Sequence, residues 1–214
     1  MANIAVFGTG QVGDVLANGF LANGDAVMRA SRDPAKLQAW KASAKGDASI
    51  GAFSDAAKWA DIIVLAVKGS AAEAVLDQAG AANLAGKIVI DTTNPIEEGK
   101  AQGGVLHYFT KANESLMERL QNKVPAARFV KAFNSVGNAF MVKPRFKHTP
   151  AMFMCGNDAA AKAEVSAILV AFGHQPVDIG GVECARPIEA LCQLWCAPGF
   201  LRNDWNHAFA WLTD

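Results

Sequence analysis

The residues with the clearest chemistry are three glycines near the start of the chain. Gly8, Gly10 and Gly13 follow the order Gly-x-Gly-x-x-Gly, directly after an apolar run at residues 3–7. A glycine loop between a strand and a helix suits the diphosphate of a dinucleotide. The turn is tight, the backbone can approach the phosphates, and the N-terminus of the helix faces their charge. Because a strand precedes and a helix follows, the pattern predicts a dinucleotide site.

A serine and an arginine after the second expected strand indicate which of the two nicotinamide cofactors binds. NAD enzymes place Asp or Glu at this strand end to hold the ribose 2′-hydroxyl. This chain has Ser31 and Arg32 there, a hydroxyl and a guanidinium that suit a 2′-phosphate. Asp33-Pro34 is typical of a helix N-cap with proline at the first helical position, so we expect Asp33 to cap rather than bind ribose. Lys36, in the first turn of that helix, either adds positive charge or is a solvated surface lysine.

The elements that must position these residues alternate between strand and helix. We expect strands at 3–7, 26–30, 48–53, 61–67, 87–91 and 128–133, with helical or loop segments between them. Continuous apolar runs such as 61–67 are typical of strands buried on both faces of a parallel sheet. The predicted fold class is α/β, a Rossmann-type doubly wound and mostly parallel sheet with a short C-terminal α/β extension.

The chain divides at about residue 135. Residues 1–135 are predicted to form the dinucleotide-binding Rossmann domain, and residues 136–214 a C-terminal extension that continues the sheet and ends in helices. Near the end, Ile188, Leu191 and Trp195 have helical spacing, and the aromatic residues Phe200, Trp205, Phe209 and Trp211 follow. Such a stripe predicts core or an interface in a homodimer, with the wall of a flat-ring site as the alternative.

Composition excludes several classes of function. The chain has 20 basic and 20 acidic residues, so its net charge gives no attraction to nucleic acid or an anionic membrane. Its apolar runs are far shorter than the ~20 residues of a spanning helix, and no charged leader or apolar signal core precedes the first strand. We expect a cytoplasmic protein. The four cysteines are expected to be small buried hydrophobes, with no metal site predicted.

With these motifs the chain resembles the NADP oxidoreductases that depend on the deazaflavin coenzyme F420. Relatives of that family include the cytosolic reductase domain of six-transmembrane metalloreductases. The resemblance covers nearly the whole chain. It rests on the glycine loop, on residues 31–37, on Thr93-Asn94-Pro95 after the fifth strand, and on residues 130–134 at the sixth. The last two motifs are more specific than the glycine loop, which Rossmann enzymes share.

The resemblance implies roles for individual residues. Thr9, Gln11 and Val12 would contact the diphosphate, Ser31 and Arg32 the 2′-phosphate, and the fifth and sixth strand ends the nicotinamide and the acceptor ring. Where the family usually has Val-Pro after the fourth strand, this chain has Val67-Lys68, whose lysine either reaches a cofactor phosphate or points to solvent. The complete expected cofactor site is Gly8, Thr9, Gly10, Gln11, Val12, Gly13, Ser31, Arg32, Lys36, Ala66, Val67, Lys68, Thr93, Asn94, Pro95, Ala132, Phe133 and Asn134.

The polar residues at the strand ends indicate the type of reaction. Thr92, Thr93, Asn94 and Asn134 can orient a ring but do not titrate. Hydride transfer between two stacked rings needs position and exclusion of water rather than a general acid or base. We therefore expect an NADPH-dependent oxidoreductase with Asn94 and Asn134 as positioning residues. Its small-molecule redox acceptor would be coenzyme F420, FMN or FAD.

Two other functions remain open from the sequence. A small-substrate NADP-dependent dehydrogenase or imine reductase would need a proton donor, for which His107 and Lys131 are the candidates. Enzymes of this type have a Rossmann domain followed by a large helical domain, whereas this chain has only about eighty residues after Asn134. The third function is that of a non-catalytic NADPH-binding sensor.

Overall fold

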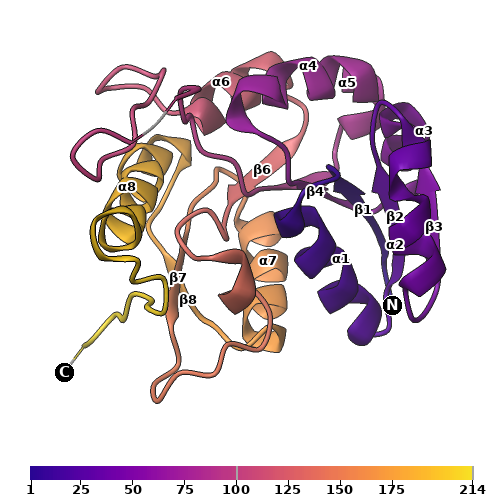
Figure 1. The fold of residues 1–214 in the computed structure, drawn as a ribbon. Coiled ribbons are helices and arrows are strands. Elements are labelled where there is room, and N and C mark those ends of the chain that lie inside the picture. Colours follow the sequence, from indigo (N-terminus) through magenta and orange to yellow (C-terminus); the bar gives the residue numbers. More distant parts are fainter. Residues whose placement is uncertain (100, 214) are drawn as a thin grey trace.

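A computed structural model describes residues 1–99 and 101–213. Six parallel strands form its main sheet in the order β3-β2-β1-β4-β5-β6 (Figure 1). They are β1 (Asn3–Phe7), β2 (Ala26–Ala30), β3 (Ala48–Gly51), β4 (Ile62–Leu65), β5 (Ile88–Asp91) and β6 (Arg128–Lys131). The strand order reverses between β1 and β4, which is where open α/β sheets bind ligands. The predicted doubly wound parallel sheet is confirmed.

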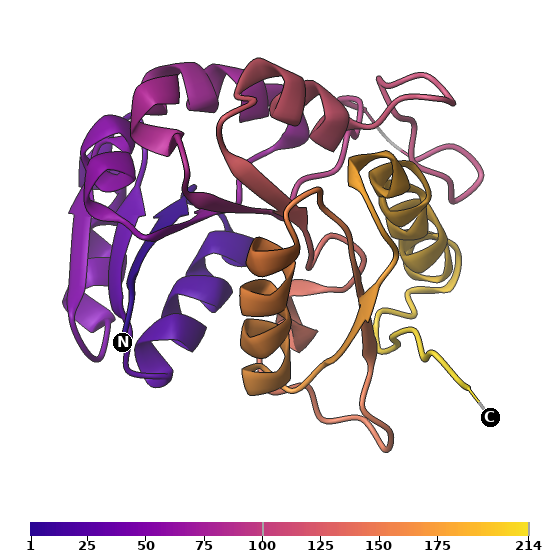
Figure 2. The ribbon, with the colours of Figure 1, turned by 180° about the vertical axis from the view of Figure 1, so that it is seen from behind.

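Helices cover both faces of this sheet (Figures 1 and 2). One face carries α1 (Gln11–Ala22) and α7 (Ala159–Ala171). The other carries α3 (Phe53–Trp59), α4 (Gly69–Ala79), α5 (Ala81–Leu84) and α6 (Leu116–Lys123). Two short elements, η1 (Pro34–Leu37) and α2 (Gln38–Ser43), connect β2 to β3. Parallel strands require such crossover connections, so the alternation in the sequence dictates the layers.

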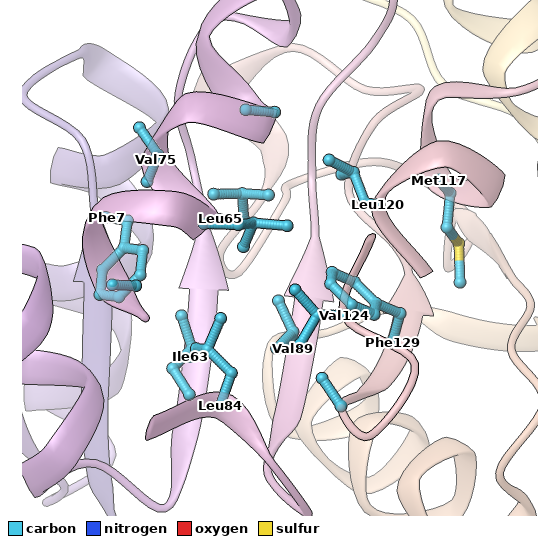
Figure 3. Packing of buried hydrophobic residues seen from close by; sticks show 14 of the residues in the cluster. Phe7, Ile63, Leu65, Val75, Leu84, Val89, Met117, Leu120, Val124 and Phe129 are labelled. Carbon is cyan, nitrogen blue, oxygen red and sulfur yellow. The ribbon is translucent and has the colours of Figure 1, made fainter. Parts of the chain in front are cut away.

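The central strands are apolar on both sides because each side faces a helical layer. Ile63 and Leu65 of β4 pack in the cluster beneath α4 and α6, together with Val89 and Phe129 (Figure 3). Ile62 and Val64 alternate to the opposite cluster beneath α1 and α7. This two-sided burial is the physical cause of the continuous apolar run in the sequence.

The C-terminal part differs from the expectation that it continues the main sheet. Strands β7 (Ala151–Met154) and β8 (Gln175–Asp178) form their own parallel two-stranded sheet. A single antiparallel bridge, between Lys131 and Cys155, connects it to β6. At this crossing a Cβ on Gly156 would lie 2.5 Å from the carbonyl oxygen of Phe129. The two backbones therefore cross at close range instead of running side by side.

A long helix, α8 (Ala185–Arg202), follows directly after the 3-10 turn η3 (Val182–Cys184). A second 3-10 turn, η2 (Asn138–Phe140), lies before β7. Helix α8 ends at Asn203, whose φ of 54° turns the chain, and residues 203–213 then form no helix. The described chain therefore ends in one helix and a tail without helix, where several helices were expected. The amide of Ala151 donates to the carbonyl of Phe209 (2.9 Å), which holds this tail along β7. None of the helices in residues 1–99 and 101–213 is long and apolar enough to cross a membrane.

Candidate functional site

A cavity of about 800 Å³ lies at the carboxyl ends of the central strands. Its walls come from residues 10–12, 66–70, 92–94 and 96–99, with Asn138 closing one side. These segments follow β1, β4 and β5, so the cavity occupies the position where the strand order reverses. The main sheet thereby brings together three sequence motifs that are spread over more than eighty residues of the chain.

The glycine loop forms one wall, and its glycines serve different purposes. Gly8 has a φ of +133°, and a Cβ there would lie 2.1 Å from the carbonyl oxygen of Ala66. Gly8 is thus required by the protein's own turn and by its contact with the end of β4. Gly13 is buried, and a Cβ would lie 3.1 Å from the Gly8 carbonyl oxygen, so it permits close packing of α1.

Gly10 is different because nothing in the protein itself requires a glycine there. Its φ of −81° is ordinary, and an added Cβ would meet no atom within 4 Å. A side chain at Gly10 would stand in the open space above the N-terminus of α1, which has no side-chain cap. A diphosphate bound to the first amides of α1 would occupy that space. The loop therefore fits the diphosphate of a dinucleotide.

The Ser31-Arg32 pair after β2 is arranged differently from the expectation that both side chains hold the 2′-phosphate. Ser31 is buried, and its hydroxyl donates to the carbonyl oxygen of Asp33 (2.6 Å) and accepts from the Asp33 amide (3.1 Å). The Ser31 hydroxyl therefore shapes the turn. The Asp33 carboxylate accepts from the amide of Ala35 (3.2 Å), which confirms its capping role. Arg32 and Lys36 are exposed on either side of this turn.

The end of β5 is fixed by side chains of its own. The Asp91 carboxylate accepts from the amide (2.9 Å) and the hydroxyl (2.7 Å) of Thr93, and the Thr92 hydroxyl donates to the carbonyl of Leu65 (3.0 Å). Gly69, at the start of α4, lies against this segment: a Cβ there would be 1.9 Å from the Asn94 carbonyl oxygen. The close approach of α4 to the strand end therefore requires a glycine.

Asn94 and Asn134 meet through their side chains. The Asn94 amide nitrogen donates to the carbonyl of Asn134 (2.8 Å), and the Asn134 amide nitrogen donates to the Asn94 side-chain oxygen (3.0 Å) and to the carbonyl of Ile188 (2.9 Å). Phe133, immediately before Asn134, has a φ of +62°, which is strained for a bulky buried residue. This turn brings the end of β6 back toward β5. Asn94 lines the cavity, and Asn134 lies behind it.

Lys131, a candidate proton donor, is locked in a buried ionic cluster. Its ammonium group lies 2.6 Å from the Asp91 carboxylate and 2.8 Å from that of Glu189, and it donates to the Thr93 carbonyl (2.8 Å). Burial alone would lower the pKa of Lys131, but the two carboxylates outweigh it and raise the pKa above its ordinary value. Glu189 also accepts from two amides at the start of α6. Lys131 is therefore a charged structural residue with no access to the cavity.

His107, the other candidate donor, is exposed on the long loop between β5 and α6. It lines a separate small cavity of about 130 Å³ rather than the one at the strand ends. Among the described residues that line the larger cavity, the titratable ones are Lys68, Glu97 and Glu98, all exposed. Lys68 lies 3.9 Å from Glu98, and both side chains are 82% exposed, so Lys68 points to solvent.

The structure thus assembles part of the predicted site. It brings Gly10, Gln11, Val12, Ala66, Val67, Lys68, Thr93 and Asn94 to one cavity. Ala132 and Phe133 are buried in the core under α7 instead, and Pro95 is buried behind the cavity wall. Ser31, Arg32 and Lys36 lie outside the cavity, at the turn after β2.

Sequence reasoning missed several residues of the site. The wall at Ile96 to Gly99 and the side at Asn138 belong to segments that carry no motif of a binding site. Arg29, a single cation within the apolar strand β2, is 2% exposed and lies beneath the glycine loop. Its position was a signal, because a charged residue in a strand that is buried on both faces needs partners.

Cys192 and Cys196 of α8 share one face of the helix, because they lie four positions apart. The sulfur atoms of Cys192 and Cys196 lie 4.0 Å apart. Within the described ranges, residues 1–99 and 101–213, no three side chains of His, Cys, Asp or Glu gather as metal ligands. All four thiols are free, and Cys155 and Cys192 are buried.

Comparison with known proteins agrees with this geometry. Residues 3–95 match the model of the family described as NADP oxidoreductase, coenzyme F420-dependent. A structure from Arthrobacter sp. FB24, provisionally described as an F420-dependent NADP-reductase, is 33% identical, covers all of both chains and superimposes with a TM-score of 0.93. The metalloreductase STEAP3 of Rattus norvegicus is 29% identical over 189 residues, which are 88% of this chain and 36% of that protein. The chain therefore spans about a third of that relative's length.

A more distant likeness concerns the fold alone. A reductive aminase from Aspergillus terreus, solved with NADPH and ethyl-5-oxohexanoate, is 18% identical with a TM-score of 0.69. The match covers 95% of this chain but 63% of the aminase. More than a third of that enzyme therefore has no counterpart in this chain.

Proposed function

Because the chain belongs to the family of coenzyme F420-dependent NADP oxidoreductases, we propose that it transfers hydride between NADP(H) and a deazaflavin or flavin ring. The nicotinamide supplies or accepts the hydride when the cofactor is bound. The cavity of about 800 Å³ at the strand ends is the place for both rings. The cofactor is NADP(H) by family, whereas the acceptor ring is part of the proposal.

The observation that carries the proposal is the chemistry of the cavity wall. At the end of β5 its surface consists of Thr92, Thr93 and Asn94, none of which titrates, and its titratable lining residues Lys68, Glu97 and Glu98 are all exposed. Lys131 is held by two carboxylates, and His107 lies outside the cavity. Reduction of a carbonyl or imine needs a proton donor at the reacting atom, whereas transfer between stacked rings needs only near-attack geometry.

The protein's own residues would then bind and orient. The amides of residues 9–13, in the glycine loop and at the N-terminus of α1, hold the diphosphate. The guanidinium of Arg32 holds the 2′-phosphate, to which it offers a fork of donors, and Lys36 adds a point charge. Asn94, fixed by Asn134, presents its side chain to the space where the rings would meet.

A screen of acceptors tests the proposal. Loss of NADPH absorbance is followed by stopped flow with coenzyme F420, FMN, FAD, a ferric chelate, and a cyclic imine as the substrate of the alternative function. We expect oxidation with a ring acceptor and none with the imine. The Arg32→Ala variant serves as control, because it should need more NADPH for the same rate. Turnover with the imine alone would replace the proposal by a small-substrate reductase, and binding of NADPH without any turnover would replace it by a sensor.

We also propose that a second copy of the chain packs against α8. The outward face of this helix carries Pro187, Ala190, Leu194, Ala197 and Leu201, at the alternating spacing of three and four that is typical of a helix pair. Leu194 and Leu201 are 60% and 58% exposed. A stripe that is apolar and uncharged along its length is complementary to itself. Sedimentation of wild type and Leu194→Glu tests this, since the charged variant should remain monomeric.

A further inference from the structure

Arg29 occupies an unusual place beneath the glycine loop. It belongs to β2 and is 2% exposed. One terminal nitrogen of its guanidinium, Nη2, donates to the carbonyl oxygens of Gly8 (3.1 Å) and Gly10 (3.3 Å). The other, Nη1, donates to the carboxylate of Asp14 in the first turn of α1 (2.9 Å). A single side chain thus joins the second strand, the loop and the helix that follows it.

Such a buried cation is costly unless it has compensating partners. Burial lowers the pKa of Arg29, and Asp14 opposes this effect. The guanidinium also lies over the ring of Trp40, 5.1 Å from its centroid. An apolar side chain would fill the same space in β2 without this cost. The contacts of Arg29 with the loop therefore call for an explanation beyond packing.

The planarity of the peptide bond supplies one. In a trans peptide the carbonyl oxygen and the amide hydrogen of the next residue point in opposite directions. Arg29 holds the oxygen of Gly8 and shares the oxygen of Gly10 with the amide of Asp14 (3.0 Å), so the amides of Thr9 and Gln11 point away from the guanidinium. Thr9, Gly10 and Gln11 are exposed, and Gly10 and Gln11 line the cavity. The guanidinium thereby fixes the direction of the amides that face a bound diphosphate.

Charge gives a second contribution. Asp14 is a carboxylate in the first turn of the helix whose N-terminus faces the expected phosphates. Its side chain is 49% exposed, and an uncompensated negative charge there would repel an anion. Arg29 pairs with Asp14 and offsets this charge. The arrangement keeps the N-terminus of α1 attractive to phosphate.

We propose that Arg29 is a positioning residue for the diphosphate of NADP(H): it orients the amides of the glycine loop from below and offsets the charge of Asp14. It does not touch the cofactor. The inference rests on the proposed function only in that NADP(H) binds at this loop. It predicts that loss of Arg29 weakens binding of the diphosphate and leaves binding of the 2′-phosphate, at the turn after β2, unchanged.

Two ligands distinguish binding of the diphosphate from binding of the 2′-phosphate. NADP⁺ contains the diphosphate, whereas adenosine 2′-monophosphate presents the 2′-phosphate without it. Dissociation constants are measured by calorimetry, or by displacement of bound NADPH, for wild type, Arg29→Met and Arg29→Lys. We expect Arg29→Met to raise the dissociation constant of NADP⁺ by about tenfold or more, which is the scale of charged hydrogen bonds. The dissociation constant of adenosine 2′-monophosphate should change by less than about twofold. Arg29→Lys keeps the charge but not the fork, so its effect on NADP⁺ should be intermediate.

Asp14→Asn in the Arg29→Met background tests the role of charge. Removing the unpaired carboxylate should restore about threefold or more of the lost NADP⁺ affinity, on the scale of a charge near a helix N-terminus. Lys87→Met is the matched structural control. Lys87 also donates to backbone carbonyls, those of Lys58 and Ala60, but at the opposite edge of the sheet. It should lower stability and leave the ratio of the two dissociation constants unchanged.

The outcomes are distinguishable. If Arg29→Met lowers the affinity for both ligands by the same factor, or for neither, the inference is overturned and Arg29 is a structural residue only. If Arg29→Met does not fold by circular dichroism, Arg29→Lys decides by the same ratio. Wild-type protein that fails to bind NADP⁺ contradicts the proposed function itself, a result that depends on no variant.

Discussion

Asn134 holds Asn94 in place from behind the cavity wall. Its side-chain nitrogen donates both to the Asn94 side-chain oxygen (3.0 Å) and to the carbonyl of Ile188 on α8 (2.9 Å). Asn134 is 4% exposed, whereas Asn94 lines the cavity. The two residues thus form a relay in which α8 and β6 set the orientation of the amide that reaches the site.

The first prediction follows from this relay. Asn134→Ala should slow turnover about tenfold or more with the best acceptor, because the Asn94 amide loses its fixed orientation and the rings their near-attack position. The affinity for NADP⁺ should change little, since the glycine loop and Arg32 remain. Steady-state rates and calorimetry measure the two effects. A rise in the dissociation constant without loss of kcat would show that Asn134 acts on binding instead.

The second prediction concerns the choice of cofactor. Since the Ser31 hydroxyl is engaged with the backbone of Asp33, Arg32 should carry most of the contact with the 2′-phosphate. Arg32→Ala should lower the affinity for NADP⁺ by roughly 10- to 150-fold and leave the affinity for NAD⁺ nearly unchanged. Ser31→Ala should mainly loosen the turn and have a smaller effect. A wild type with equal affinity for both cofactors, or an Arg32→Ala protein that keeps its preference, would contradict this.

Features that depend on local pattern could be predicted from the sequence. All six strands of the main sheet lie within the expected ranges, because most of them are short, mainly apolar runs between turn residues. The glycine loop and the Asp33 cap are also local, since a few adjacent residues determine the backbone there. The common strand direction then brings residues 10–12, 66–68 and 93–94 to one edge without further information.

Features that depend on distant contacts could not be predicted. Glu189 binds the start of α6, seventy-three positions earlier in the chain, and no local pattern indicates such a partner. The left-handed turn at Phe133 removes Ala132 and Phe133 from the cavity, and it depends on packing against β7 and α7. The separate sheet of β7 and β8 likewise results from a backbone crossing at Gly156.

The third prediction tests whether Lys131 is structural. Lys131→Met should lower the free energy of unfolding by ~3–5 kcal/mol, because it leaves Asp91 and Glu189 buried without a counter-charge. Adding Glu189→Gln should recover part of this loss, since it removes one of the two uncompensated charges. Denaturant unfolding measures both. A Lys131→Met protein of normal stability that has lost only turnover would instead identify Lys131 as a proton donor.

The fourth prediction concerns the aromatic tail. Trp195 is 8% exposed, its ring lies against Gly137, and its indole nitrogen donates to the carbonyl of His207 (2.9 Å). Trp195→Ala should therefore cost ~3–5 kcal/mol of unfolding free energy. Trp211→Ala is the matched control, because Trp211 is 47% exposed. This change should lower the free energy of unfolding by less than about 1 kcal/mol. Equal effects of the two changes would refute the burial of Trp195.

The fifth prediction is a dependence of stability on pH that originates at His174. This residue is 3% exposed, its Nε2 lies 3.0 Å from the carbonyl of Met141, and burial lowers its pKa below the ordinary value of about 6.5. Below that value the unfolded chain binds a proton that the folded protein resists. Stability from the neutral ring is therefore complete above about pH 6.5 and decreases as the pH falls further.

His174→Gln isolates this contribution from other titrating groups. The variant should be less stable than wild type at about pH 8. Between about pH 6.5 and 5 it should lose less stability than wild type, because it has no buried imidazole whose protonation favours unfolding. His148, an exposed histidine, gives the matched control: His148→Gln should leave the slope unchanged. Thermal unfolding of the three proteins at each pH makes the comparison. If His174→Gln retains the full wild-type slope, the acid sensitivity originates in other groups, and the neutral ring of His174 does not control it.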